Sequence, residues 1–142
     1  MPEEKDDALR KFAEAVERGR TLERLAKALE GKVLRRTVSN VGGGVSGVIS
    51  SSEIKYGLFL YADGTFRFET TEFTSVSSGG YGMPSEEKRS SEGTWAVEMI
   101  EDRPALVLRQ EGSIVRWWYA EDGGSGSQYL NGERWDRYLI RK

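Results

Sequence analysis

The chain has 142 residues, no cysteine, no histidine and a formal net charge of −2. This length fits one domain that can bury a core without disulfides. The absence of cysteine and histidine excludes thiolate metal sites, thiol catalysis, Ser-His-Asp triads and haem ligation by imidazole. The 21 basic and 23 acidic residues are mixed along the chain, so the charge distribution does not favour nucleic acid as a partner.

No apolar run approaches the roughly 18 residues that a membrane span requires. The acidic beginning of the chain lacks the apolar segment of a secretory signal. We therefore expect a cytoplasmic protein without a membrane span.

The first thirty residues carry two apolar faces at helical spacing. The first face consists of Leu9, Phe12, Ala13 and Val16. After Gly19 the phase changes, and the second face consists of Leu22, Leu25, Ala26 and Leu29. We interpret residues 1–31 as a helical segment that packs on the rest of the chain, either as two short helices or as one helix kinked near residues 19–21.

The next part of the chain alternates between strand and loop patterns. Residues 32–39 predict a first strand. Residues 40–47 contain too many glycines for a strand, and we expect a flexible loop rather than a phosphate-binding loop. Residues 48–62 predict a strand, and Asp63-Gly64 is typical of a two-residue hairpin turn before Phe66 and Phe68. Residues 74–92 predict a long loop with a short strand near residues 88–91.

Residues 93–140 have the pattern of an antiparallel meander. Turn-forming residues separate four runs of β-branched, aromatic and aliphatic residues; they lie at positions 101–104, 111–112, 122–124 and 131–132. Residues 114–120 are apolar on both faces. We assign Val115, Trp117 and Tyr119 to one face and Ile114, Arg116 and Trp118 to the other, and we expect the N-terminal helices to cover this strand.

These elements predict a mainly β fold: a single antiparallel up-and-down barrel of about eight strands, residues 32–142, preceded by the helical segment. A sheet of this length closes on itself because open edges promote aggregation. An interior of this size is either filled by side chains or holds one small ligand.

Four short motifs are similar to those of a known family. They are Tyr61-Ala-Asp-Gly-Thr-Phe66, Gly93-Thr-Trp95, Leu106-Val-Leu108 and Tyr129-Leu-Asn-Gly-Glu-Arg-Trp135. In this order they resemble the small bacterial lipocalin-like (calycin-type) barrels. The resemblance implies an antiparallel barrel with a cup at one end, in a superfamily whose better-known members bind small apolar molecules.

Aromatic residues make up 11% of the chain, and many fall on the predicted inner face of the barrel. The residues predicted to face inward and to bind a ligand are Tyr56, Leu58, Phe66, Phe68, Trp95, Val97, Met99, Leu106, Leu108, Trp117 and Tyr119. Such a wall suits a hydrophobic or aromatic ligand. The alternative is that the rings simply fill the barrel.

The charged residues of the last strands have two possible roles, ligand binding and surface ion pairing. The last strands contain the arginines Arg109, Arg116, Arg134, Arg137 and Arg141. One of them either binds a ligand carboxylate at the barrel mouth or belongs to a solvated outer face paired with Glu98, Glu133 or Asp136. The carboxylates of Glu53, Glu69 and Glu98 alternate with apolar neighbours, which places them outside the barrel, and they have no partner for acid–base catalysis. We therefore predict no catalytic residue, metal ligand or cofactor.

Three functions fit these patterns. The first is a module that holds a small hydrophobic or aromatic molecule in the cup. The second is a protein-interaction or regulatory domain that acts, or self-associates, through the N-terminal helices and residues 74–92. The third is a barrel enzyme that acts by confinement, such as a cyclase with a Tyr or Glu hydrogen bond.

Overall fold

The computed structural model describes residues 2–43, 49–78, 81–123 and 126–140. Within these residues one helix, α1 (Pro2–Leu29), precedes eight strands. The strands are β1 (Lys32–Gly43), β2 (Ile49–Leu60), β3 (Thr65–Ser78), β4 (Tyr81–Ile100), β5 (Arg103–Gln110), β6 (Ser113–Asp122), β7 (Ser127–Leu130) and β8 (Glu133–Leu139). Each strand pairs with the next and β8 pairs with β1, so the predicted closed antiparallel barrel is confirmed.

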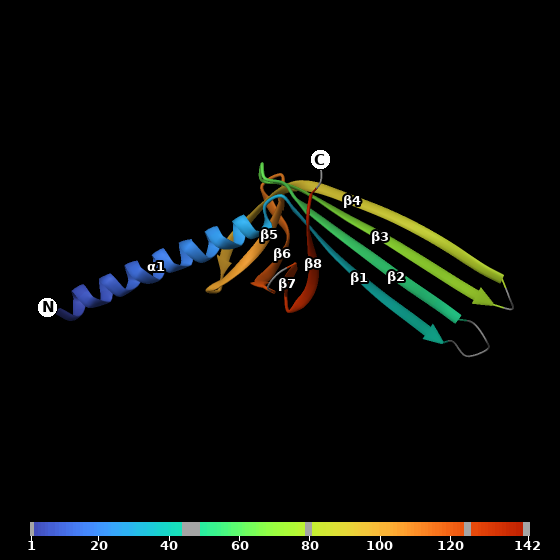
Figure 1. The fold of residues 1–142 in the computed structure, drawn as a ribbon, viewed down its shortest axis with the longest axis horizontal. Helices are drawn as coiled ribbons and strands as arrows, with labels where there is room; N and C mark the ends of the chain where they lie inside the picture. The colour runs from blue at the N-terminus through green and yellow to red at the C-terminus, as the bar shows by residue number, and fades with distance from the viewer. Residues whose placement is uncertain (1, 44–48, 79–80, 124–125, 141–142) are drawn as a thin grey trace.

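The first four strands are much longer than the barrel needs (Figure 1). β1 pairs with β8 only at residues 32–35, whereas it pairs with β2 along its full length. β4 pairs with β3 at residues 81–94 and with β5 at residues 94–100. The far parts of the strands therefore extend from the barrel as a four-stranded sheet. We call this sheet the arm: residues 36–43, 49–56, 70–78 and 81–89.

The arm replaces two predicted loops. Residues 74–92 lie in β3 and β4, apart from residues 79–80, which are outside the described residues. The prediction of a long loop there is wrong. β1 continues to Gly43, so a loop at residues 40–43 is also wrong, and residues 44–48 lie outside the described residues. The composition of these segments resembles that of a loop, but a ladder uses backbone groups that every residue except proline supplies.

Type I′ turns join strands of the barrel as predicted. Both Asn131 and Gly132 have positive φ between β7 and β8, as the primed hairpin turns require. The turn after Leu60 differs from the prediction. Tyr61 pairs with Thr65 through a hydrogen bond of 2.9 Å, so the loop has three residues, and Gly64 takes the positive φ.

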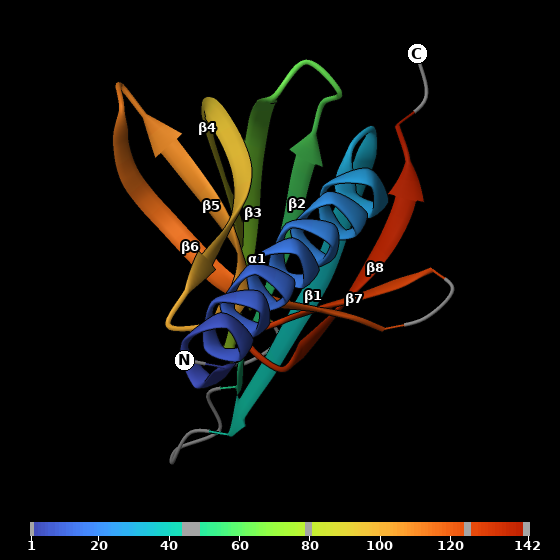
Figure 2. The ribbon, with the colours of Figure 1, turned by 90° about the vertical axis from the view of Figure 1, so that its left-hand side faces the viewer.

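The helix is continuous from Pro2 to Leu29, with Gly19 and Thr21 in its interior, so of the two predicted alternatives the one with two separate helices is wrong. Its last turns lie against one end of the barrel, and its first half projects away from it (Figure 1). Figure 2 shows the barrel strands arranged around the helix axis. Neither α1 nor any other described segment forms a helix long and apolar enough to cross a membrane.

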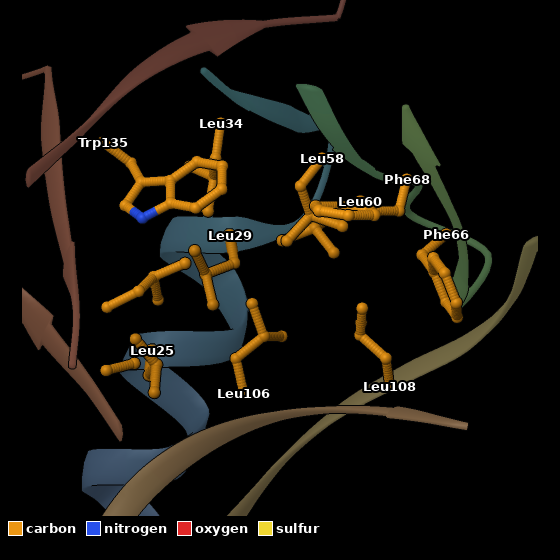
Figure 3. Close-up of a cluster of buried hydrophobic side chains, with 12 residues drawn as sticks. Leu25, Leu29, Leu34, Leu58, Leu60, Phe66, Phe68, Leu106, Leu108 and Trp135 are labelled. Carbon is orange, nitrogen blue, oxygen red and sulfur yellow. The ribbon is translucent and has the colours of Figure 1, made fainter. Parts of the chain in front are cut away.

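The core fills the barrel and includes the end of the helix. Its members are Leu25, Leu29, Leu34, Leu58, Leu60, Phe66, Phe68, Leu106, Leu108, Ala120, Leu130 and Trp135. Figure 3 shows that Leu25 and Leu29 lie among side chains contributed by the surrounding strands. Leu29 is fully buried, at 0% exposure. Burial of a leucine stabilises the fold by about 1.5 to 3 kcal/mol, so α1 closes this end of the barrel as part of the core.

A β-bulge corrects the predicted faces of β6. Arg109 pairs with Ile114 and Leu108 pairs with Arg116, so Val115 is an extra residue in the ladder. An extra residue inverts the alternation of every residue that follows it. Arg116 and Trp118 are therefore on the inner face of β6.

The predicted inward positions of Trp117 and Tyr119 are consequently wrong. Trp118 packs against the core instead, and Trp117 is 39% exposed. Ile114 and Val115 are each 50% exposed. The prediction that α1 covers the outer side of this strand is also wrong.

Candidate functional site

The predicted ligand-binding residues divide into core and rim. Leu58, Phe66, Leu106 and Leu108 are at most 2% exposed and belong to the packed core. They are parts of the barrel filling rather than walls of an open cup.

The remaining inner-face residues are less deeply buried. Tyr56, Trp95 and Val97 are partly buried and pack against the core. Met99 is partly buried on the same face of β4 and pairs with Pro104. Of the predicted set, Tyr56 and Phe68 line a pocket next to the core.

This pocket has a volume of about 370 Å³ and lies where the barrel meets the arm. We call it the mouth pocket. Its lining consists of Tyr56, Phe68, Thr70, Glu72, Glu87, Arg89, Ser90, Ser91 and Arg116.

Strand register explains why these side chains, apart from that of Ser90, share one face. Tyr56 pairs with Thr70, which pairs with Arg89 in β4. One step closer to the barrel, Phe68 pairs with Leu58 and with Ser91. Because side chains on one face of a sheet recur every second residue, the inner face of the barrel continues along the arm. The pocket thus has an apolar side toward the core and a polar side toward the arm.

Aromatic rings form the apolar side. The rings of Tyr56 and Phe68 are stacked, with centroids 6.1 Å apart. The ring centroid of Trp118 lies 6.2 Å from that of Phe68 and 6.1 Å from that of Trp135. The centroid of Trp135 lies 5.8 Å from that of Tyr56. These four rings form a closed circuit of contacts. Each such pair stabilises the fold by about 0.5 to 1.5 kcal/mol beyond the stabilisation that comes from its buried area. We call these four rings the aromatic floor of the pocket.

One polar atom in this circuit lacks a partner. Trp135 is 4% exposed, and its Nε1 has no hydrogen bond within the described part of the chain. Figure 3 shows this nitrogen at the edge of the core cluster. An N–H that is buried without a hydrogen bond costs about 1 to 3 kcal/mol.

Arg116 lies over the aromatic floor. Its guanidinium is 4.9 Å from the centre of the Phe68 ring and 5.7 Å from that of Trp118. Among the described residues it forms no ion pair or hydrogen bond. A guanidinium stacked on a ring keeps its N–H groups at its edge, available to an anion.

Two other arginines of the last strands, Arg109 and Arg134, are paired with carboxylates, as the alternative interpretation predicts, and Arg137 donates a hydrogen bond to the amide oxygen of Gln128. Arg109 donates two hydrogen bonds to Glu98, one of them 2.9 Å long. These bonds hold the pKa of Glu98 below its ordinary value of 4.5, against the opposing effect of burial. Nε of Arg134 lies 3.7 Å from Oδ1 of Asp136. Arg141 is outside the described residues.

The arm side of the pocket carries charges of both signs. Glu72 pairs with Glu87 across the ladder, and Arg89 donates bonds of 2.9 and 2.6 Å to Glu87. Hydrogen bonding to Glu87 raises the pKa of Arg89. Since Arg89 is already bound to a carboxylate, Arg116 is the better placed cation for a ligand. In the described ranges no group of three or more acidic side chains is arranged to hold a metal ion.

Sequence reasoning placed Arg116 on the wrong face. The cause is the bulge at Val115, which inverts the alternation after it. No glycine marks this bulge, so the local sequence carries no clear signal of it.

Comparison with protein-family models, curated proteins and solved structures gives no match for this chain. The eight-stranded antiparallel barrel preceded by one helix is compatible with a lipocalin-like fold. The site itself must therefore carry the functional argument.

Proposed function

We propose that the protein is a lipocalin-like binding module that holds a small aromatic anion in the mouth pocket. The observation that carries this proposal is the environment of Arg116. Its guanidinium is stacked on Phe68 and Trp118, and it has no carboxylate partner among the described residues. A positive charge held beside the aromatic rings that border the pocket favours a ligand that has both an anionic group and an apolar body.

The apolar body of the ligand would contact Tyr56 and Phe68. Ligand pockets typically have volumes of about 300 to 1,000 Å³, and at about 370 Å³ the mouth pocket fits a small ligand of one or two rings. A larger molecule would have to enter the barrel, where Leu29 and Leu58 are fully buried in the core. The proposed ligand therefore lies at the mouth, not in a deep cup.

The anionic group would accept hydrogen bonds from Arg116. A carboxylate or sulfonate matches the planar fork of a guanidinium, which fixes orientation as well as adding affinity. Glu72 and Glu87 on the arm side disfavour additional negative charge there. We therefore expect a single anionic group, directed toward β6.

The test compares two ligands of equal shape. Binding of 2-naphthoate and of the uncharged 2-naphthamide is measured by calorimetry and by quenching of tryptophan fluorescence. Wild-type protein is expected to bind the carboxylate at least about tenfold more tightly, since an interaction with a charged partner contributes about 1.5 to 3 kcal/mol. Arg116→Gln should abolish this preference while leaving binding of the amide unchanged.

Arg109→Gln is the matched control, because Arg109 is bound to Glu98 on the outer face. It should retain the preference for the carboxylate. Equal binding of the two ligands by the wild type, or an unchanged preference in Arg116→Gln, would show that the proposal is wrong.

A second candidate function, protein interaction, is favoured by a different observation. Leu9 and Phe12 on the projecting half of α1 are 66% and 69% exposed. Large apolar side chains grouped at such exposure are typical of an interaction surface.

A further inference from the structure

The helix α1 has two apolar faces that point in different directions. Near its C-terminal end, Leu25 and Leu29 enter the barrel core. In its first half, residues 6–17 are exposed except for the partly buried Asp7. An ion pair joins the middle of the helix to the barrel: Nη2 of Arg18 lies 2.8 Å from Oδ1 of Asp102. The segment before Arg18 therefore extends beyond the barrel, as Figure 1 shows.

The exposed half is amphipathic in its own right. Its apolar face consists of Ala8, Leu9, Phe12, Ala13, Ala15 and Val16. At about 100° per residue these positions span an arc of about 160°, which is as wide as the buried face of a packed helix. We call this surface the helix stripe.

The helix stripe cannot fold onto its own barrel. At about 100° per residue, the mean direction of Leu9, Phe12 and Val16 differs by about 140° from that of the barrel-facing leucines at positions 22, 25 and 29. A straight helix that presents one set to the barrel presents the other away from it. The change of phase after Gly19 thus turns the stripe away from the barrel, so a partner of the stripe would lie outside its own barrel.

We propose that the partner is a second copy of this chain, bound through an antiparallel pairing of the two helix stripes. The alanines that accompany the large residues allow two helices to approach closely. A twofold axis near Ala13 would bring the large side chains of the two stripes together. Because the stripe faces away from the barrel, the two barrels lie on opposite sides of the helix pair and do not obstruct it.

Charge at the border of the stripe supports this arrangement. Asp6, Arg10, Glu17 and Arg20 are exposed and lie along one border, beside Ala13; within one copy Arg10 also forms an exposed ion pair with Asp7. In an antiparallel pair the same borders of the two helices adjoin. Asp6 then faces Arg20 of the second copy, and Arg10 faces Glu17 of the second copy. Each opposite-charge pair occurs twice by symmetry.

A membrane surface fits the helix less well. Residues 6–18 contain four carboxylates and three basic side chains, whereas helices that lie on anionic lipid have a basic polar face. A partner that presents the same mixed pattern in reverse order, as a second copy does, satisfies both signs of charge.

The test is the mass of the full-length protein in solution across a range of concentration, from about 1 μM to about 1 mM. Sedimentation is expected to show a shift from the monomer mass of 16.0 kDa toward twice that mass. Phe12→Glu should raise the dissociation constant by about tenfold or more, because it places charge at the centre of the apolar contact. Glu14→Lys, on the opposite side of the helix, is the matched control and should leave the dissociation constant unchanged.

A charge exchange tests the antiparallel geometry. Arg10→Glu alone and Glu17→Arg alone should each weaken the dimer, since each brings like charges together, and the double variant should restore it. Circular dichroism and tryptophan fluorescence of each variant are the control that tests whether the barrel stays folded. The residues changed are exposed and are not members of the core, so folding should be unaffected.

Because the chain contains no cysteine, single-cysteine variants report the pairing directly. A mixture of Asp6→Cys and Arg20→Cys chains should form mainly the mixed disulfide on mild oxidation. A monomer at every concentration, a dimer insensitive to Phe12→Glu, or a predominance of disulfides between identical variants would overturn the proposal.

Discussion

The indole N–H of Trp95 donates a hydrogen bond of 2.8 Å to the backbone carbonyl of Tyr61. The backbone N–H of Trp95 also donates to the carbonyl of Gly64, at 2.9 Å. Two motifs that are 34 positions apart, the hairpin at residues 61–66 and the part of β4 that begins at residue 93, are thereby joined. The tryptophan fixes the end of the β2–β3 hairpin at the point where β4 passes from the arm into the barrel.

Trp95→Phe should therefore destabilise the protein. The variant loses the bond from the indole to the Tyr61 carbonyl, which keeps only the 3.0 Å bond from the backbone N–H of Gly64, at a cost of about 1 kcal/mol. Denaturant unfolding followed by circular dichroism measures the change. Trp117→Phe removes an indole that is 39% exposed and should cost less than about 0.5 kcal/mol. Similar losses in the two variants would contradict a structural role for the Trp95 bond.

Gly93 provides a second prediction. A Cβ atom at this position would lie 2.1 Å from the carbonyl oxygen of Arg109 and 2.8 Å from Cε1 of Phe66. Since neither backbone nor a core ring yields easily, Gly93→Ala should destabilise the protein by about 2 to 3 kcal/mol.

The control for this change is Gly19→Ala. Nothing lies within 4 Å of a Cβ at Gly19, which is in the exposed interior of α1. Because alanine is the better helix former, this variant should gain about 0.5 to 1 kcal/mol. Opposite signs for the two substitutions, measured by thermal and denaturant unfolding, are the expected result.

Local signals predicted the barrel well. The turn at Asn131-Gly132 is determined by residues that tolerate positive φ. The inner positions of Leu58, Phe68, Leu106 and Leu108 follow from simple alternation, because no bulge interrupts their strands before the core. The closed antiparallel topology then follows from short connections between neighbouring strands.

Features that depend on distant partners were not predictable in the same way. The arm consists of segments rich in serine, glycine and charge, whose pairing depends on long neighbouring strands rather than on their own composition. The bulge at Val115 inverted the assignment of Arg116 and Trp117 and so concealed the mouth pocket. The phase change after Gly19 was visible in the sequence, but which apolar face enters the core and which stays exposed required the position of the barrel.

A third prediction concerns the end of the helix. Leu29→Ala should destabilise the protein by about 2 to 5 kcal/mol, because Leu29 is fully buried among core side chains from several strands. Leu9→Ala, where the side chain is 66% exposed, should change stability by less than about 0.5 kcal/mol in dilute protein. Thermal unfolding of both variants distinguishes a helix that completes the core from one that merely rests on the barrel. Equal, small effects would contradict the former.

A fourth prediction follows from the pair of Arg109 and Glu98. Glu98 lies in β4 and Arg109 in β5, and on the outer face the paired residues Ala96 and Val107 lie between them. The ion pair therefore runs diagonally across the two strands. Hydrogen bonds from Arg109 lower the pKa of Glu98 in the folded protein below the ordinary value of 4.5. A carboxyl group whose folded pKa is lowered contributes stability that is present above its unfolded pKa and is lost as the pH falls through its folded pKa.

The free energy of unfolding should therefore decrease as the pH falls below about 4.5, and part of this decrease should disappear in Glu98→Gln. Urea unfolding at a series of pH values from about 6 to about 3 measures both curves. Glu111→Gln, in the exposed β5–β6 turn, is the control and should follow the wild-type curve. Glu98 is partly exposed, so added salt should reduce the difference between Glu98→Gln and the wild type. A Glu98→Gln curve parallel to that of the wild type throughout this range would show that the pair with Arg109 does not contribute to acid sensitivity.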